Sequence, residues 1–190
     1  MAHYTGFVSI PHGSYQEWRD ATLGSAYDYD GWFGEQCWDF VQECYAQYGL
    51  TLQTGGGTAA GCWLYRKNQN AVNPFVAVEG ITNIKRGDII VTGATPTNYA
   101  GHICFADEDY NGSNYLDCLG QNQIGNGSGY PVTVTRLSIA TFLGIFRNQE
   151  WQGTPPPTPE IGYNKGKYNF VLFNRRKRQE KWTKRPLKRK

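Results

Sequence analysis

The spacing of apolar residues changes once along this chain, from a helical period to the period of β-strands. Between Gln36 and Tyr48, apolar side chains recur at positions 41, 44, 45 and 48, which form one face of a helix. Later segments alternate apolar and polar residues with period two, and they span 87–93, 101–108, 115–122 and 130–137. Asn111-Gly112 is a hairpin signal between the second and third of these strands. The pattern predicts an α+β fold with N-terminal helices packed on an antiparallel β-sheet.

The 190-residue length favours one compact domain with an appendage. A content of 39% hydrophobic and 18% charged residues excludes a disordered chain. Three consecutive prolines within 151–160 predict a stiff linker. We therefore expect a folded domain over 1–150, a Pro-rich linker over 151–160, and a short aromatic segment with a basic C-terminal tail over 161–190. The glycine-rich run 54–61 lacks the Gly-Lys-Ser/Thr ending of a phosphate loop, and we interpret it as a connecting loop.

The charge is concentrated at the C-terminus. Residues 174–190 hold ten Lys or Arg and one acid, a charge of +9, which leaves −6 on residues 1–173. Such a block is typical of a tail that binds a polyanion: nucleic acid, an anionic wall polymer, or the acidic face of a partner protein. The alternative is a solvated tail that binds nothing. The N-terminus has no signal-peptide pattern and no apolar run reaches the ~18 residues of a membrane span, so we expect synthesis and folding in a cytoplasm.

The cysteines predict free thiols. Their number is five, no C-x-x-C occurs, and a secretory signal is not evident, so a complete disulfide framework and a structural zinc site are both disfavoured. Cys37 is expected in the first turn of the helix, where the helix dipole, and an imidazolium nearby, would lower its pKa. The other four cysteines fall where no helix N-terminus is predicted, and we assign them to packing.

His102 is the best-placed base of the chain. His3 lies near the chain start and His12 in an expected loop, whereas His102 begins a predicted strand. Alternation puts His102, Cys104 and Ala106 on one face and the intervening residues on the other. Taken singly, Cys37 and His102 are ordinary packing residues; taken together, a helix-borne thiol and a sheet-borne imidazole are the elements of nucleophilic catalysis.

Four motifs in order resemble the CHAP domains, cysteine- and histidine-dependent amidohydrolases/peptidases of bacterial peptidoglycan. The motifs are YDYDGWFGEQCWDF, KRGDIIVTG, AGHICFADE and LGQNQIG, and the resemblance covers about residues 20–147. It implies a papain-like fold with Cys37 as nucleophile, His102 as general base and the Gln36 side chain as oxyanion-hole donor. The family often carries a Glu-Gln-Asn run whose Glu or Asn orients the histidine. This chain has Gly120-Gln121-Asn122, so only Asn122 carries over, giving a Cys-His-Asn arrangement.

The role of Asn122 carries a prediction about strand register. An even-numbered loop centred on Asn111-Gly112 would pair His102 with Gln121 and put Asn122 on the opposite face. An odd-numbered loop or a bulge shifts the pairing by one and brings Asn122 to the His102 face. We predict that shift. Without it, Gln121 would have to take the place of Asn122 as the polar partner of His102.

Three acids before and after the cysteine suggest a cation site. Asp28, Asp30 and Asp39, with the carbonyls of Trp32 and Gly34, provide oxygen ligands suited to calcium, and the resemblance implies the same. The pattern is not an EF-hand, because Phe33 stands where that motif needs glycine. The alternative is that the acids simply complement the helix dipole.

The resemblance implies a peptidoglycan hydrolase, either an endopeptidase or an N-acetylmuramoyl-L-alanine amidase. Without a visible signal peptide, a bacteriophage origin is expected, first as a virion-associated lysin and next as a free endolysin. The protein would then reside in the phage tail or leave the host cytoplasm at lysis, and residues 174–190 would bind phage tail proteins or an anionic polymer. The competing hypothesis is an inactive CHAP-like structural protein that binds nucleic acid or a virion partner through this tail.

Overall fold

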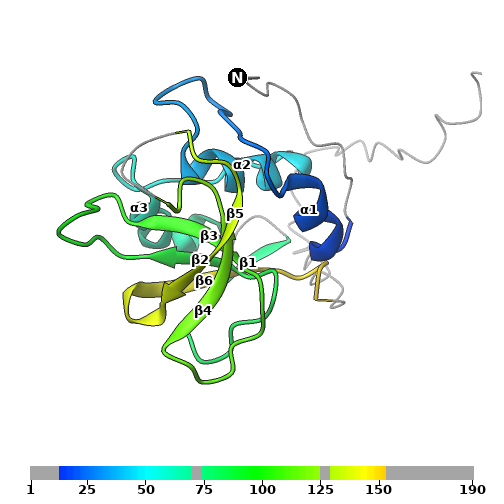
Figure 1. Cartoon of the computed structure of the whole chain (residues 1–190), viewed down its shortest axis with the longest axis vertical. Helices are drawn as coiled ribbons and strands as arrows, with labels where there is room; N and C mark the ends of the chain where they lie inside the picture. The colour runs from blue at the N-terminus through cyan, green and yellow to red at the C-terminus, as the bar shows by residue number, and fades with distance from the viewer. Residues whose placement is uncertain (1–12, 70–73, 125–128, 153–190) are drawn as a thin grey trace, which may run out of the picture. The chain divides into compact units, whose positions relative to one another are not determined.

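The computed structural model describes residues 13–69, 74–124 and 129–152 (Figure 1). The helices of this part come first along the chain: α1 (Tyr15–Thr22), α2 (Cys37–Gln47), α3 (Ala59–Leu64) and α4 (Arg66–Gln69). The strands follow: β1 (Phe75–Val78), β2 (Ile89–Thr92), β3 (His102–Ala106), β4 (Tyr115–Gly120), β5 (Thr133–Ser138) and β6 (Phe142–Asn148), with a short 3₁₀ helix at Ile139–Thr141.

The strands form one antiparallel sheet in the order β1-β6-β2-β3-β4-β5. The predicted α+β class is therefore confirmed; β2, β3 and β4 fall within segments predicted as strands, and β5 extends one residue beyond the fourth. The interpretation of 54–61 as a loop was wrong for its last three residues, which belong to α3. Thr58 caps this helix by accepting a hydrogen bond from the backbone N–H of Gly61 at 3.1 Å. The sequence pattern also missed α1, β1 and β6.

Helix α1 begins with a capping box. The backbone N–H of Glu17 donates to the Ser14 hydroxyl at 3.3 Å, and the backbone N–H of Ser14 donates to the Glu17 carboxylate at 2.8 Å. The buried residues of this helix, Tyr15, Trp18 and Thr22, recur at helical spacing and face the sheet.

Aromatic side chains fill the space between the helices and the sheet. Phe40 of α2 lies at the centre, with ring centroids 5.6 Å from Trp18, 5.8 Å from Tyr27 and 5.3 Å from Phe105 of β3. Offset and edge-to-face contacts at these distances each stabilise the fold beyond the burial of area. This cluster fixes α2 on β3 and so sets where the helix N-terminus lies.

The two faces of β3 pack into different clusters, as alternation predicts. Ile103 and Phe105 belong to the cluster on the helix side, whereas Cys104 and Ala106 belong to a second cluster with Ile90 of β2 and others. His102 begins the strand opposite Thr92 of β2 and belongs to neither cluster.

In the described residues, no helix is long and apolar enough to cross a membrane. The predicted linker, aromatic segment and basic tail fall almost wholly in 153–190, outside those residues. Their boundaries stay predictions, as do the placements of His3 and His12.

Candidate active site

Cys37 is the first residue of α2, as predicted. Gln36 precedes it with an extended backbone (φ −100°, ψ 162°), and its N–H donates to the Asp39 carboxylate at 2.8 Å. Gly49 lies just beyond the other end of α2 with φ +70°, a conformation that suits glycine. Residue Cys37 is partly exposed, whereas Cys44, Cys62, Cys104 and Cys118 are fully buried, and all five are free. Cys37 is thus the least buried of the five cysteines, and the expected free thiols and packing roles are confirmed.

The Cys37 thiol lies near the first residues of β3, where β4 does not pair with that strand. The β3–β4 ladder covers only Phe105 and Ala106, although β3 starts at His102, so the first part of β3 has no β4 partner in the described structure. The backbone N–H of Ile103 lies beside the Cys37 sulfur, and the Cys37 charge also acts on Cys104. The thiol therefore lies near the start of β3, beside Ile103, which is the residue that follows His102 in the chain. Within the described residues, no hydrogen bond joins the two side chains, a frequent state of catalytic pairs before substrate binds.

Both groups are held in their neutral forms. Burial raises the pKa of Cys37 to about 11; the backbone N–H of Ile103 opposes this rise and the charge of Asp39 adds to it. Burial lowers the pKa of His102 to about 4, against a favourable contact from the Gln123 side chain. The expected lowering of the Cys37 pKa was wrong, because desolvation outweighs the helix N-terminus and the imidazole near it is uncharged. The chemistry that fits is a neutral thiol and a neutral base.

Two amide side chains tie the helix N-terminus to the end of β4. The Gln121 side chain is fully buried: its oxygen accepts from the Tyr27 N–H at 2.7 Å, and its nitrogen donates to the carbonyls of Tyr27 at 2.7 Å and Gln36 at 2.8 Å. The Asn122 nitrogen donates to the Gln36 side-chain oxygen at 3.4 Å. The Gln36 side chain in turn donates to the Phe33 carbonyl at 2.9 Å, so one of its two N–H groups remains for an oxyanion.

The predicted register shift is confirmed, but its expected consequence is not. Phe105 pairs with Leu119 and Ala106 with Cys118, which is the pairing shifted by one. Beyond Gly120 the chain leaves the ladder, and Asn122 has φ +56°, a left-handed conformation. Its side-chain nitrogen donates to Gln36, and within the described residues no hydrogen bond joins it to His102, so the role of Asn122 in orienting His102 stays a prediction.

The predicted acids come together where the loop between α1 and α2, drawn in blue at the top of Figure 1, meets the first turn of α2, which carries Asp39. Ligand oxygens of Asp28, Asp30 and Asp39 all lie within 4.8 Å of one another. Asp39 is 1% exposed, and burial followed by the charges of Asp30 and Asp28 raises its pKa to about 7, against donation from the N–H groups of Gln36 and Tyr29. The Oδ1 atom of Asp28 is buried and lacks a hydrogen-bond partner among the described residues.

These groups fit a hard cation. Carboxylate oxygens are the ligands that calcium prefers, and a cation would satisfy the buried Asp28 oxygen and offset the mutual repulsion of the acids. Trp32 and Gly34 lie in the same loop; Gly34 and Phe33 adopt left-handed conformations at φ +68° and +66°. The ligand roles of their carbonyls stay predictions.

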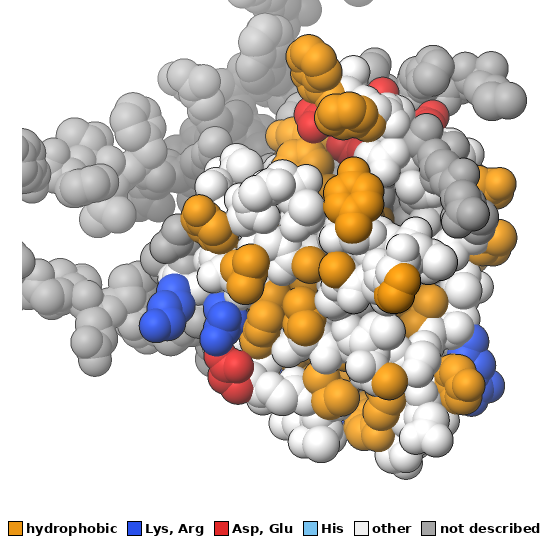
Figure 2. Space-filling model, turned by 90° about the vertical axis from the view of Figure 1, so that its left-hand side faces the viewer, with side chains coloured by type: hydrophobic (Ala, Val, Ile, Leu, Met, Phe, Trp, Pro, Cys, Tyr) orange, Lys and Arg blue, Asp and Glu red, His pale blue; other side chains and the backbone are white. Residues whose placement is uncertain are grey.

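The same loop exposes two aromatic rings that the sequence analysis did not weigh. Trp32 is 69% and Phe33 is 85% exposed. Figure 2 shows hydrophobic side chains beside acidic ones at the top of the face that it presents. Large apolar side chains at such exposure often mark a surface that binds a ligand.

The sequence and the fold resemble known proteins as follows. No family model matches the sequence. The chain is 34% identical over 161 residues to the D-alanyl-L-alanine endopeptidase of Streptococcus phage B30, an alignment that covers 82% of this chain and 34% of that protein. The chain thus spans about a third of the length of this curated relative.

Two solved structures share the fold. The endolysin LysIME-EF1 superposes with a TM-score of 0.53 at 21% identity, over 70% of this chain and 63% of that one. Ly7917, solved with the hydrolyzing product of MDP, gives 0.50 at 18% identity, over 76% and 63%. At these identities the likeness concerns the fold alone, and it agrees with the papain-like α+β architecture expected from the sequence.

Proposed function

We propose that this chain is the catalytic domain of a bacteriophage peptidoglycan hydrolase, a CHAP-type cysteine endopeptidase or amidase. The observation that carries the proposal is the Cys37 thiol at the start of α2, beside the strand that His102 begins, in a chain 34% identical to a phage D-alanyl-L-alanine endopeptidase. That relative favours a peptide bond of the peptidoglycan stem over the muramoyl-alanine amide.

In the proposed mechanism, His102 takes the thiol proton as the Cys37 sulfur attacks the substrate carbonyl carbon. The oxyanion accepts hydrogen bonds from the Cys37 backbone N–H, one of the free N–H groups of a helix start, and from the remaining N–H of Gln36. Asn122 holds the Gln36 amide by its 3.4 Å hydrogen bond. The C–N bond then breaks as the His102 imidazolium protonates the leaving amine, and water attacks the acyl-enzyme with His102 again as base.

Calcium is proposed as a resident ion of the loop. Asp28, Asp30 and Asp39 would hold it, with the carbonyls of Trp32 and Gly34. When bound, it would neutralise the acids and fix the loop that leads into Gln36 and Cys37. The ion takes no part in bond making or breaking.

The biological setting of the domain is also proposed. A phage lysin acts on the wall either from the virion tail or after release from the host cytoplasm at lysis. The basic tail at 174–190 supports an anchoring role toward phage tail proteins or an anionic polymer.

The test is digestion of purified streptococcal peptidoglycan, with mass spectrometry of the released fragments. Wild-type protein should release new amino termini, and Cys37→Ala should release none while keeping its melting temperature. Cys44→Ala is the matched control on the same helix, which retains cleavage if it folds. Equal release by wild type and Cys37→Ala would refute the proposal; release of muramic acid free of peptide would change the bond assigned.

A further inference from the structure

Gly120 at the end of β4 leaves a space that a neighbouring amide fills. A Cβ atom at Gly120 would lie 2.8 Å from the Cβ of Cys104 and 2.9 Å from the Cδ of Gln123. Those separations are too short for real atoms, so only glycine lets the Gln123 amide lie over this strand. Cys104 is two residues from His102 on the same face of β3, which brings the Gln123 amide to the His102 side of the sheet.

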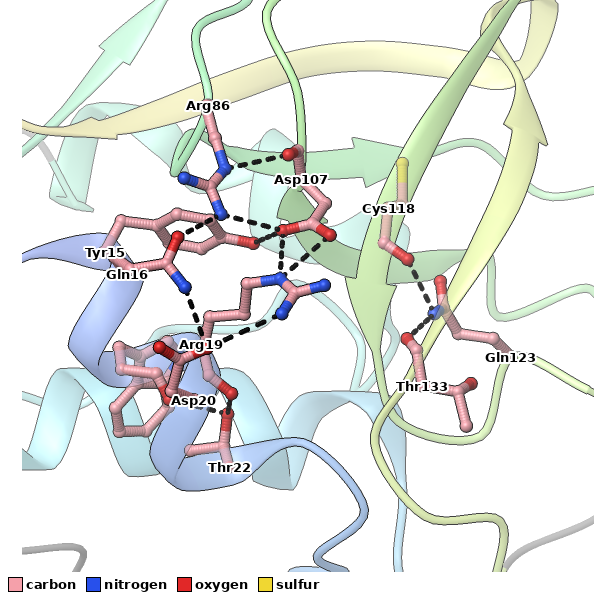
Figure 3. Close-up of polar contacts among 11 residues, drawn as sticks. Tyr15, Gln16, Arg19, Asp20, Thr22, Arg86, Asp107, Cys118, Gln123 and Thr133 are labelled. Atoms are coloured by element: carbon pink, nitrogen blue, oxygen red, sulfur yellow. Dashed lines mark hydrogen bonds and ion pairs between the residues drawn. The ribbon is translucent and has the colours of Figure 1, made fainter.

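The orientation of the Gln123 amide is fixed by its nitrogen (Figure 3). Gln123 Nε2 donates to the backbone carbonyls of Thr133 at 2.8 Å, Cys118 at 3.0 Å and Gly120 at 3.2 Å. Carbonyls accept and cannot donate, so the atom that faces them must be the nitrogen. The amide oxygen consequently points the other way.

Several buried side-chain atoms lack hydrogen-bond partners among the described residues, the Asn122 Oδ1 atom included, and two of them are complementary and belong to side chains that interact. One is Gln123 Oε1, an acceptor; the other is His102 Nε2, which donates when protonated. The two side chains interact, since the Gln123 amide favours the protonated imidazole. An unpaired buried polar group destabilises the folded state, and pairing these two atoms removes both costs at once.

We propose that Gln123 is the positioning residue of His102, an inference that rests on the proposed function. Gln123 Oε1 accepts a hydrogen bond from His102 Nε2–H. The neutral ring therefore carries its proton on Nε2 and presents a bare Nδ1 to the Cys37 thiol. Gln123 does not touch substrate; its three anchoring carbonyls belong to β4 and β5, so the sheet itself fixes the tautomer of the base.

The test reads the tautomer directly in the full chain. Long-range ¹H–¹⁵N spectra of histidine-labelled protein distinguish the two ring nitrogens, and the His102 signal is the one lost in His102→Gln. Wild type should show a protonated Nε2 and a bare Nδ1. Gln123→Ala should give a mixture of tautomers, whereas Asn122→Ala, the adjacent residue bonded to Gln36, should leave the His102 tautomer unchanged.

Kinetics on a soluble stem-peptide substrate supply the second readout. Gln123→Ala should lower kcat about ten- to a hundredfold with KM unchanged, because a misplaced base affects the reaction and not binding. A wild-type spectrum with the proton on Nδ1 would overturn the inference, even if Gln123→Ala does not fold. So would an unchanged tautomer in Gln123→Ala, or a mixture in Asn122→Ala alone.

The two hypotheses fail separately. If the wild-type protein cleaves no peptidoglycan but shows the Nε2–H tautomer that depends on Gln123, the proposed function is wrong and the contact stands. If it cleaves peptidoglycan with a tautomer indifferent to Gln123, the function stands and the inference is wrong.

Discussion

At the scale of single residues, desolvation sets the protonation states of this site. Cys37, His102, Asp39 and Glu43 all have pKa values shifted toward the neutral form, with burial as the largest cause in each. The proposed mechanism therefore transfers a proton from thiol to imidazole during attack, and does not start from the ion pair that the helix dipole alone would suggest.

Glu43, which has no role in the proposed reaction, allows a test of the claim that burial shifts the pKa values of these groups toward the neutral form. It lies one helical turn after Asp39 and is 4% exposed; burial, and next the charge of Asp39, raise its pKa from 4.5 to about 7. A carboxyl whose pKa is raised on folding favours the folded state below pH 4.5, and this contribution is lost as the pH rises through 7. Glu43→Gln should therefore match wild type near pH 4 and exceed its free energy of unfolding by about 3 kcal/mol at pH 8.

Urea unfolding in EDTA at a series of pH values measures this difference. The matched control is Glu17→Gln, which changes a carboxyl in the exposed capping box of α1. A Glu43→Gln variant less stable than wild type at pH 8 would contradict the account.

At the scale of elements, one ion-pair network holds α1 on the sheet (Figure 3). Asp107, after β3, accepts from Arg19 Nε at 2.7 and 3.0 Å and from the Tyr15 hydroxyl at 3.0 Å. The Arg86 guanidinium donates to the Asp107 backbone carbonyl at 2.9 Å and lies over the Tyr15 ring at 5.0 Å. Because Asp107 is only 9% exposed, removing it leaves partly buried cations without their partner.

Asp107→Ala should lower the free energy of unfolding by about 3 kcal/mol. Asp20→Ala is the matched control, since Asp20 is 60% exposed and pairs with the same arginine at 3.6 Å; its cost should stay below about 0.5 kcal/mol. Chemical unfolding of the three proteins decides it, and equal costs for the two variants would show that the network does not hold α1.

The acidic loop between α1 and α2 carries the calcium prediction. Excess calcium should raise the melting temperature by several degrees over EDTA, as expected for an ion present at about 100 times its Kd. Magnesium should do much less, and Asp28→Asn should abolish the calcium effect. Superimposable melting curves in calcium and EDTA would leave the acids as partners of the helix N-terminus only.

Local patterns predict the elements here but not their side-chain contacts. The helix at Cys37 and the strand at His102 follow from spacing. The shifted register does not follow from the hairpin signal, and its prediction rests on the role expected of Asn122. Helix α1 could also have been predicted, because Ser14 and Glu17 form a capping box beside Tyr15 and Trp18. The role of Gln123 could not be predicted, since its amide is placed by three carbonyls and a glycine that come together only in the folded sheet. Likewise, pKa values set by burial have no local pattern.

At the scale of the whole molecule, the positive charge is concentrated in the C-terminal residues and the rest of the chain is negatively charged. Residues 174–190, outside the described structure, carry +9, and a cationic tail beyond a Pro-rich stretch can bind a polyanion without changing the active site. Deleting 174–190 should weaken binding to walls, DNA or virions in a salt-dependent manner, while cleavage of a small soluble peptide stays the same. Binding that ignores salt would point instead to the aromatic segment 168–173.

The central claim is that the Cys37 thiol is the nucleophile, and the most direct measurement is selective alkylation followed against activity. Iodoacetamide is added to the folded wild-type protein, and at each time point peptide mapping locates the label while wall clearing is assayed. Residue Cys37 is partly exposed and the other four cysteines are fully buried. The account predicts one label, on Cys37, with activity falling in proportion to its occupancy. Full activity with Cys37 alkylated, or inactivation that follows the label on Cys44 or Cys62, would contradict it.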